Sequence, residues 1–192
     1  MISKVLIWIL ILSSIPLVSR GRTIRQAGAK LGGAFSTLAN YNDNRLDVDR
    51  VWGVDGGVFI EWLDMPTFSL VTEVHLLQKG ATFINKGTYE SGGTSPRTDG
   101  YLSIPVMGKI RLGADAVIPY FLSGPRVDFL VTSTGKSKTV DIGVTLALGI
   151  EIPSTNDVVF GFEFRFSPSF NSLYPSGARN TSMEFLFVVA PS

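Results

Sequence analysis

The chain has 192 residues, with 17 lysines and arginines against 16 aspartates and glutamates. This length fits one domain, and the even charge balance argues against a nucleic-acid-binding protein, which needs a basic face. Charged residues make up 17% and hydrophobic residues 45% of the chain, whereas a typical soluble domain has roughly 25% charged residues. The absence of cysteine excludes disulfides, thiol catalysis and cysteine-ligated metals. The composition indicates apolar surface that is hidden in a core or placed in lipid.

Residues 1–21 differ from the rest of the chain. Lys4 gives a positive start, residues 5–18 are apolar apart from two serines, and small residues follow. This order is typical of a cleaved secretory signal peptide. The alternative is a membrane anchor, although the apolar run is shorter than the roughly 20 residues that a spanning helix needs. We therefore expect a signal peptide at 1–21 and a mature domain at 22–192.

Beyond residue 25, apolar residues alternate with polar or small ones, which is the pattern of β-strands. The expected strands are 27–38, 51–63, 67–79, 100–112, 118–131, 139–151, 158–167 and 182–190. Most of them span about 10 to 13 residues. A globular strand averages about 5–6 residues, whereas a tilted membrane strand needs about 9–11. The sequence thus predicts an all-β fold, an eight-stranded antiparallel up-and-down transmembrane β-barrel.

The connections between these strands differ in length. Short ones fall at 64–66, 113–117 and 152–157, while long ones rich in Asn, Gly, Ser and Thr fall at 39–50, 80–99 and 168–181. Outer-membrane barrels have short periplasmic turns and longer outer loops. Because loops on rigid scaffolds carry function, the regions 80–100 and 168–182 are the expected contact surfaces for other envelope or secretion proteins.

Alternation alone does not say which face points inward. A soluble lipocalin-like barrel places its apolar face inside, around an apolar ligand, whereas a membrane barrel turns that face to lipid. The apolar faces here are uninterrupted by Lys or Glu, and the polar faces combine charges with small residues that suit a narrow lumen. Aromatic residues near strand ends would fit interfacial girdles; they are Trp52, Trp62, Tyr101, Tyr120, Phe129 and Phe166. Together these features favour the outer membrane and contact with its lipid, with the secreted lipocalin-like barrel as the alternative.

If the apolar faces meet lipid, charged side chains of both signs crowd the lumen. Unpaired charges would be costly there, so we expect paired charges and a closed pore. The expected structural network comprises Glu61, Glu73, His75, Lys109, Arg111, Arg126, Asp128, Asp141, Glu163 and Arg165. A wide channel is not expected because porins need about 16 strands. A small pore is a weaker alternative.

The sequence contains little that points to catalysis. His75 is the only histidine, and a catalytic role would need a partner such as Ser69 or Ser103, as in eight-stranded lipid A deacylases. Metal binding needs three or four ligands, and no phosphate-binding, dinucleotide or nucleophile-elbow motif is present. We therefore expect no enzyme activity, no cofactor and no metal. A lipid A-modifying enzyme is the alternative.

Five segments, in order, resemble those of an outer-membrane β-barrel family common in Bacteroidetes, which includes the PorT-like proteins. EVHLLQKG at 73–80 is similar to its E-x-x-Y-x-x-K-G segment, YLSIPVMGK at 101–109 to its YLEIPLLLK, and PYFLSGPRVDF at 119–129 to its PYLLAGPYVGY. Residues 27–38 and 141–149 resemble its GLKGGLNLSNL and DFGLVLGAG segments. The resemblance implies an eight-stranded barrel in the outer membrane. A structural, adhesion or secretion-support role is the corresponding expectation.

Overall fold

The computed structural model describes residues 24–39, 46–63, 65–85, 94–113, 116–133, 139–154, 157–171 and 178–191. The expected signal peptide at 1–21 lies outside these ranges. The strands are β1 (Ile24–Ala39), β2 (Leu46–Asp49), β3 (Val51–Trp62), β4 (Phe68–Asn85), β5 (Thr94–Arg111), β6 (Ile118–Thr132), β7 (Val140–Pro153), β8 (Val158–Pro168) and β9 (Arg179–Pro191). No helix in these ranges is long and apolar enough to cross a membrane.

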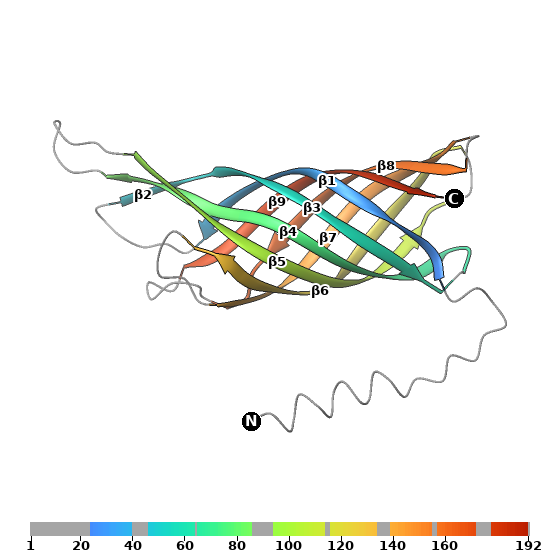
Figure 1. The fold of residues 1–192 in the computed structure, drawn as a ribbon, viewed down its shortest axis with the longest axis horizontal. Helices are drawn as coiled ribbons and strands as arrows, with labels where there is room; N and C mark the ends of the chain where they lie inside the picture. Colours follow the sequence, from blue (N-terminus) through green and yellow to red (C-terminus); the bar gives the residue numbers. More distant parts are fainter. Residues whose placement is uncertain are drawn as a thin grey trace, which may run out of the picture.

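The strands form one closed antiparallel barrel (Figure 1). Each strand from β3 onward pairs with its neighbour in the chain, β1 pairs with both β3 and β9, and the β4–β5 pairing completes the circle. The short β2 pairs with the end of β4, next to β3, from which only Arg50 separates it. Since β2 extends the wall that β3 forms, the barrel has eight strands around its circumference. The predicted fold class is confirmed.

The two ends of the barrel differ. The short connections from β3 to β4, β5 to β6 and β7 to β8 lie at one end, together with the start of β1 and the end of β9 (Figure 1). We call this the turn end. The longer connections leave from the opposite end, which we call the loop end. In outer-membrane barrels the turn end faces the periplasm.

Two of the expected loop regions are partly wrong. The β4–β5 hairpin continues its pairing from Gly80↔Thr98 to Ile84↔Thr94, so much of the region 80–100 is strand. In the region 168–182, Pro168 ends β8 and the residues from 179 onward belong to β9. A ladder of backbone hydrogen bonds does not depend on apolar side chains. Pairing therefore extends past the point where the alternating hydrophobic pattern stops.

The barrel turns its apolar face outward. Leu148 is 63% exposed, whereas Glu163 on the adjacent strand is 3% exposed. The two faces alternate along every long strand, as the burial of β7, β8 and β9 shows. A small apolar cluster does lie inside; it consists of Phe59, Val71, Met107, Tyr120, Leu122, Ala147, Val188 and Ala190. The rest of the interior is mostly polar and charged, which is the inversion that separates a membrane barrel from a soluble one.

Candidate functional site

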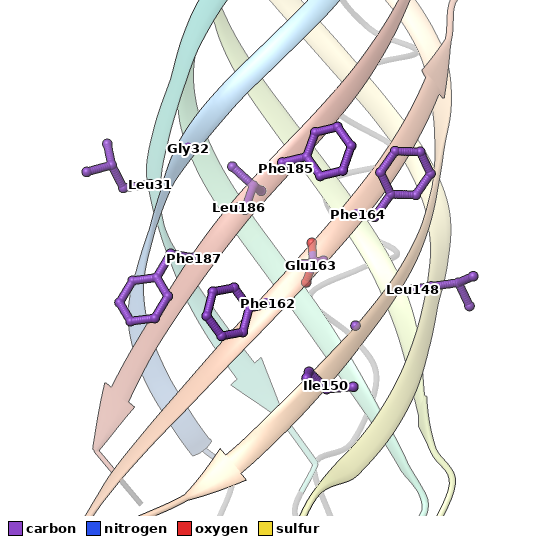
Figure 2. Close-up of a pocket in the computed structure, with 11 residues that line it drawn as sticks. Leu31, Gly32, Leu148, Ile150, Phe162, Glu163, Phe164, Phe185, Leu186 and Phe187 are labelled. Atoms are coloured by element: carbon purple, nitrogen blue, oxygen red, sulfur yellow. The ribbon is translucent and has the colours of Figure 1, made fainter.

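The outer wall formed by β8 and β9 is aromatic. Figure 2 shows the rings of Phe162, Phe164, Phe185 and Phe187 on the outer side of these strands, while Glu163 between them points to the interior. The ring centroids of Phe164 and Phe185 lie 4.9 Å apart, and those of Phe162 and Phe187 lie 5.4 Å apart. These rings line a shallow outer groove almost free of polar atoms. Such a surface requires an apolar surrounding.

The expected aromatic girdle is partly wrong. Trp52 and Phe129 are exposed on the outer face, but Tyr101 and Tyr120 are buried in the lumen. The Tyr120 hydroxyl donates a hydrogen bond to Glu163 (2.8 Å), and the ammonium of Lys109 lies 4.4 Å from the centre of the Tyr120 ring. A phenol combines an apolar ring with a polar tip, so tyrosine can serve inside a charged lumen as well as at an interface.

The structure places all ten residues of the expected lumen network inside the barrel, and each is 5% exposed or less. Their contacts fall into three layers along the barrel axis. The turn-end layer consists of Arg25, Glu61, Lys109, Arg111 and Glu151. The central layer consists of Lys30, Asp55, Glu73, His75, Glu163 and Arg165. The loop-end layer consists of Lys79, Arg126, Asp128, Asp141, Ser169, Asn180 and Glu184.

In the turn-end layer, two cations share two carboxylates. Arg111 Nη2 lies 2.6 Å from Glu61 Oε1, and its Nε lies 2.9 Å from Glu151 Oε2. Lys109 contacts the same two carboxylates, with Nζ 3.0 Å from Glu61 Oε2. Arg25 adds a third cation 3.3 Å from Glu61. Because β1, β3, β5 and β7 supply these groups, the ion pairs cross the lumen and tie non-adjacent strands together.

The central layer contains a closed ring of four charges. Lys30 lies 2.6 Å from Glu73 and 2.8 Å from Glu163. Arg165 contacts the same two carboxylates and lies 2.7 Å from Glu73 Oε2. The ring is electrically neutral and joins β1, β4 and β8. These four side chains have few alternative positions, because moving one of them away from its partners would leave an uncompensated charge inside the barrel.

His75 lies beside this ring with both nitrogens engaged. Its Nδ1 is 2.6 Å from Asp55 Oδ1, and its Nε2 is 3.0 Å from Glu73 Oε2. Ser103 is the residue directly opposite His75 on β5, whereas Ser69 accepts a hydrogen bond from Arg111 (3.2 Å). The His75 ring thus contacts two carboxylates, and its contacts resemble those of a lysine or arginine in an ion-pair network.

In the loop-end layer, Asp128 is the main acceptor. Lys79 Nζ lies 2.5 Å from Asp128 Oδ2, and Arg126 Nε lies 3.1 Å from the same oxygen. The hydroxyl of Ser169 donates to Asp141 Oδ2 (2.6 Å). Leu38, Ala81 and Ala178 form a small buried apolar cluster near the same end of the barrel.

Sequence reasoning missed several members of the network. Lys79 is the last residue of the expected strand 67–79, and Asn180 lies within the expected connection 168–181. A signal for Lys79 was present, because Glu73, His75 and Lys79 occupy alternate positions of one inward face of β4. No comparable signal marks Asn180, whose inward position depends on where the β8–β9 pairing stops.

Glycines make room for rings in the lumen. Gly149 is paired with Tyr120, and a Cβ at Gly149 would lie 2.3 Å from the Tyr120 ring.

Gly149→Ala should therefore displace the Tyr120 ring from Lys109 and Glu163 and destabilise the barrel by about 1–3 kcal/mol. Urea unfolding in lipid vesicles checks the value. Gly100→Ala is the control, since a Cβ there would lie 3.5 Å from the Thr132 side chain, an ordinary van der Waals distance. Equal stability of Gly149→Ala and wild type would contradict the packing described.

The layers show no preformed metal centre. In the described ranges, no three His, Cys, Asp or Glu side chains are grouped so as to hold a metal ion. The carboxylates instead face lysine and arginine side chains. These ion pairs neutralise charges in the interior of the barrel and join strands that are not adjacent in its wall.

A closed antiparallel barrel with an apolar outer wall and a charged interior defines the class of transmembrane β-barrels. Sequence comparison gives the family: the chain belongs to the outer membrane protein beta-barrel domain family, whose profile matches residues 22–174. The protein is therefore an outer-membrane β-barrel in contact with lipid.

Several solved structures match this one at low sequence identity. Neisserial surface protein A (NspA) is 13% identical, the match covers 86% of this chain and 96% of that one, and the TM-score is 0.55. Ail, the attachment invasion locus protein of Yersinia pestis, is 13% identical over 86% and 97% of the two chains, with a TM-score of 0.44. The outer membrane protease OmpT from Escherichia coli also matches, at 10% identity, 89% and 98% coverage and a TM-score of 0.36. No curated protein sequence matches significantly.

Proposed function

We propose that this protein is a structural component of the outer membrane, with a rigid, closed lumen and no catalytic activity. The observation that carries the proposal is the set of ion pairs that crosses the lumen in all three layers. A lumen filled by neutralising charge pairs has no continuous water path for ions, and it resists deformation of the wall.

The ion pairs support rigidity because they join strands far apart around the circumference. Lys30 on β1 holds Glu73 on β4 and Glu163 on β8. Lys109 on β5 holds Glu151 on β7. Opening the lumen would require several of these buried pairs to separate together. The side chains of the barrel strands therefore act as a plug that fills the lumen.

The contacts of His75 support the proposal that the protein is not a lipid A-modifying enzyme. A general base must accept a proton from its nucleophile within hydrogen-bond reach. Both His75 nitrogens face carboxylates, and the residue is 2% exposed. His75→Ala should leave the lipid A profile of the producing cells unchanged. An altered profile would favour the enzyme alternative.

The proposal also covers export of the protein and its contacts with other envelope proteins. We propose that residues 1–21 are removed on export, and that the protein supports adhesion or secretion in the manner expected of PorT-like proteins. Contacts with other envelope proteins would then use the tips of the loop end, within 80–100 and 168–182. The extended β4–β5 hairpin supports this, because its strand pairing continues to Ile84↔Thr94, beyond Gly100, where the pairing of β5 with β6 begins.

Two measurements test the proposal. The protein extracted in detergent should migrate differently before and after boiling, and in planar bilayers it should give no steady conductance. Recovery in the soluble periplasm without detergent would favour the lipocalin-like alternative. Steady conductance would contradict the closed lumen. The double variant Lys109→Met/Arg111→Met provides the positive control, because it removes two cations of the turn-end layer and should allow conductance or prevent folding.

A further inference from the structure

Two cationic side chains lie on the outside of the barrel, Arg50 and Arg179. Among the lysines and arginines whose side chains the structure describes, these two alone are exposed, and each of the others belongs to one of the three lumen layers. Both lie at the loop end, since Arg50 directly precedes β3 and Arg179 begins β9. Arg179 shares the outward face of β9 with Phe185, and Arg50 is two residues before the exposed Trp52. The exposed positive charge is therefore gathered at one end of the outer wall.

The two arginines flank the same strand, β1. The pairing of β1 with β3 ends at Ser36↔Val51, next to Arg50, and Ala39 on β1 is paired with Arg179. Neighbouring strands are about 4.8 Å apart and residues rise about 3.4 Å along a strand, so the two arginine backbones are roughly 12 Å apart. Their side chains can thus contact one ligand together.

The two guanidinium groups lie where the apolar outer face of the wall ends. The outward residues of β9 change from Phe185 through Thr181 to Arg179. In the described ranges neither guanidinium has an ion-pair partner, and the neighbouring Asp49 accepts the backbone N–H of Arg50 (2.7 Å). Because the turn end faces the periplasm, this boundary lies at the headgroups of the outer leaflet, where arginine side chains reach the anionic groups of lipids.

A row of aromatic rings crosses the wall on the membrane side of the two arginines. The ring centroid of Phe35 lies 3.6 Å from that of Trp52 and 6.4 Å from that of Phe185, and Phe185 lies 4.9 Å from Phe164. Gly33 leaves room for the first of these rings, since a Cβ there would lie 2.6 Å from Trp52. The row spans β3, β1, β9 and β8 and continues into the outer groove of Figure 2. Rings held by one another offer an apolar surface that loses little entropy when a ligand covers it.

We propose that this face binds lipid A, a disaccharide lipid with a phosphate at each end and several acyl chains, without modifying it. Arg50 and Arg179 would each bind one phosphate, because a guanidinium pairs with phosphate through two parallel hydrogen bonds. The acyl chains would lie on the row of rings. A second copy of this chain fits less well, since a two-fold interface would place the two arginines against their own counterparts. The inference rests on the outward orientation of the loop end and does not depend on the closed lumen.

The test is calorimetric titration of the folded barrel in detergent with lipid A. The wild type should bind about one lipid A per barrel, and lipid A from which both phosphates have been removed should bind at least tenfold more weakly. Arg50→Gln/Arg179→Gln should weaken binding of intact lipid A at least tenfold and bind the dephosphorylated lipid as the wild type does, because both changes remove the same contacts. Thr67→Glu/Ser154→Glu is the matched control: it lowers the net charge by the same two units at the turn end and should leave binding unchanged.

Tryptophan fluorescence locates the bound lipid. Lipid A with brominated acyl chains should quench Trp52, seen in a Trp62→Phe variant, and should leave Trp62 at the other end of β3, seen in a Trp52→Phe variant, unquenched. Equal affinity of wild type and Arg50→Gln/Arg179→Gln, or equal affinity for lipid A with and without phosphates, would overturn the inference. Equal competition by phosphatidylglycerol would overturn the assignment to lipid A.

Two further measurements separate this inference from the rest. Heat-dependent gel migration shows that each variant is folded, so that a loss of binding is not a loss of the barrel. Conductance reports on the closed lumen. A folded, non-conducting wild-type barrel that does not bind lipid A therefore contradicts this inference alone.

Discussion

Arg165→Leu should destabilise the barrel by about 3–5 kcal/mol, the cost of breaking a buried ion pair by removing one partner. Arg165 contacts both Glu73 and Glu163. Without it, Lys30 is the one cation left in the ring of four charges, and the ring is no longer neutral. The free energy of unfolding, measured by urea titration in lipid vesicles through tryptophan fluorescence, provides the test.

Arg179→Leu is the matched control, since this arginine is exposed at the start of β9. Its substitution should change stability by no more than about 0.5 kcal/mol. The double variant Arg165→Leu/Glu163→Leu should recover much of the loss, because replacing both partners by apolar groups leaves no unpaired charge. An Arg165→Leu protein as stable as the wild type would show that the ring does not hold the wall together.

Leu148→Arg should cost about 2–4 kcal/mol, as expected for a charge on the lipid face near the bilayer midplane. Leu148 points outward near the middle of β7, where it lines the outer groove with Phe162 and Phe164 (Figure 2). Among the described residues that line this groove, only Glu163 is charged, and its side chain points to the interior. Refolding yield into vesicles and urea unfolding measure the effect.

Leu112→Arg separates membrane depth from the loss of a leucine. Leu112 is 63% exposed, as Leu148 is, but it follows the last residue of β5 at the turn end. An arginine there reaches the interface, where the cost falls to about 0–1 kcal/mol. Equal costs at the two positions, or none at either, would mean that the apolar face does not contact a bilayer.

The fold could be predicted because a barrel strand carries its own signal. In β7 and β8 the side chains alternate without interruption between lipid and lumen, and the strands are longer than those of globular sheets. The expected loops 80–100 and 168–182 were too wide because the strand ends in these regions do not carry this alternating signal. Outside the bilayer no lipid selects apolar residues, and strand pairing there continues in Thr- and Ser-rich sequence that has no hydrophobic period.

The sequence by itself determined that Glu73, Glu163 and Arg165 share the inner face, since the side-chain period of two assigns each residue of a strand to one face. Only the tertiary structure decided which of them meet. Lys30 and Glu163 are far apart in the chain and contact each other because the barrel closes between β1 and β9. The shear between strands then sets the height of each charge in the lumen. The same closure brought Asn180 beside Ser169, a contact that does not follow from alternation alone. Tyr120, by contrast, shares the inward parity of Arg126 and Asp128 on β6.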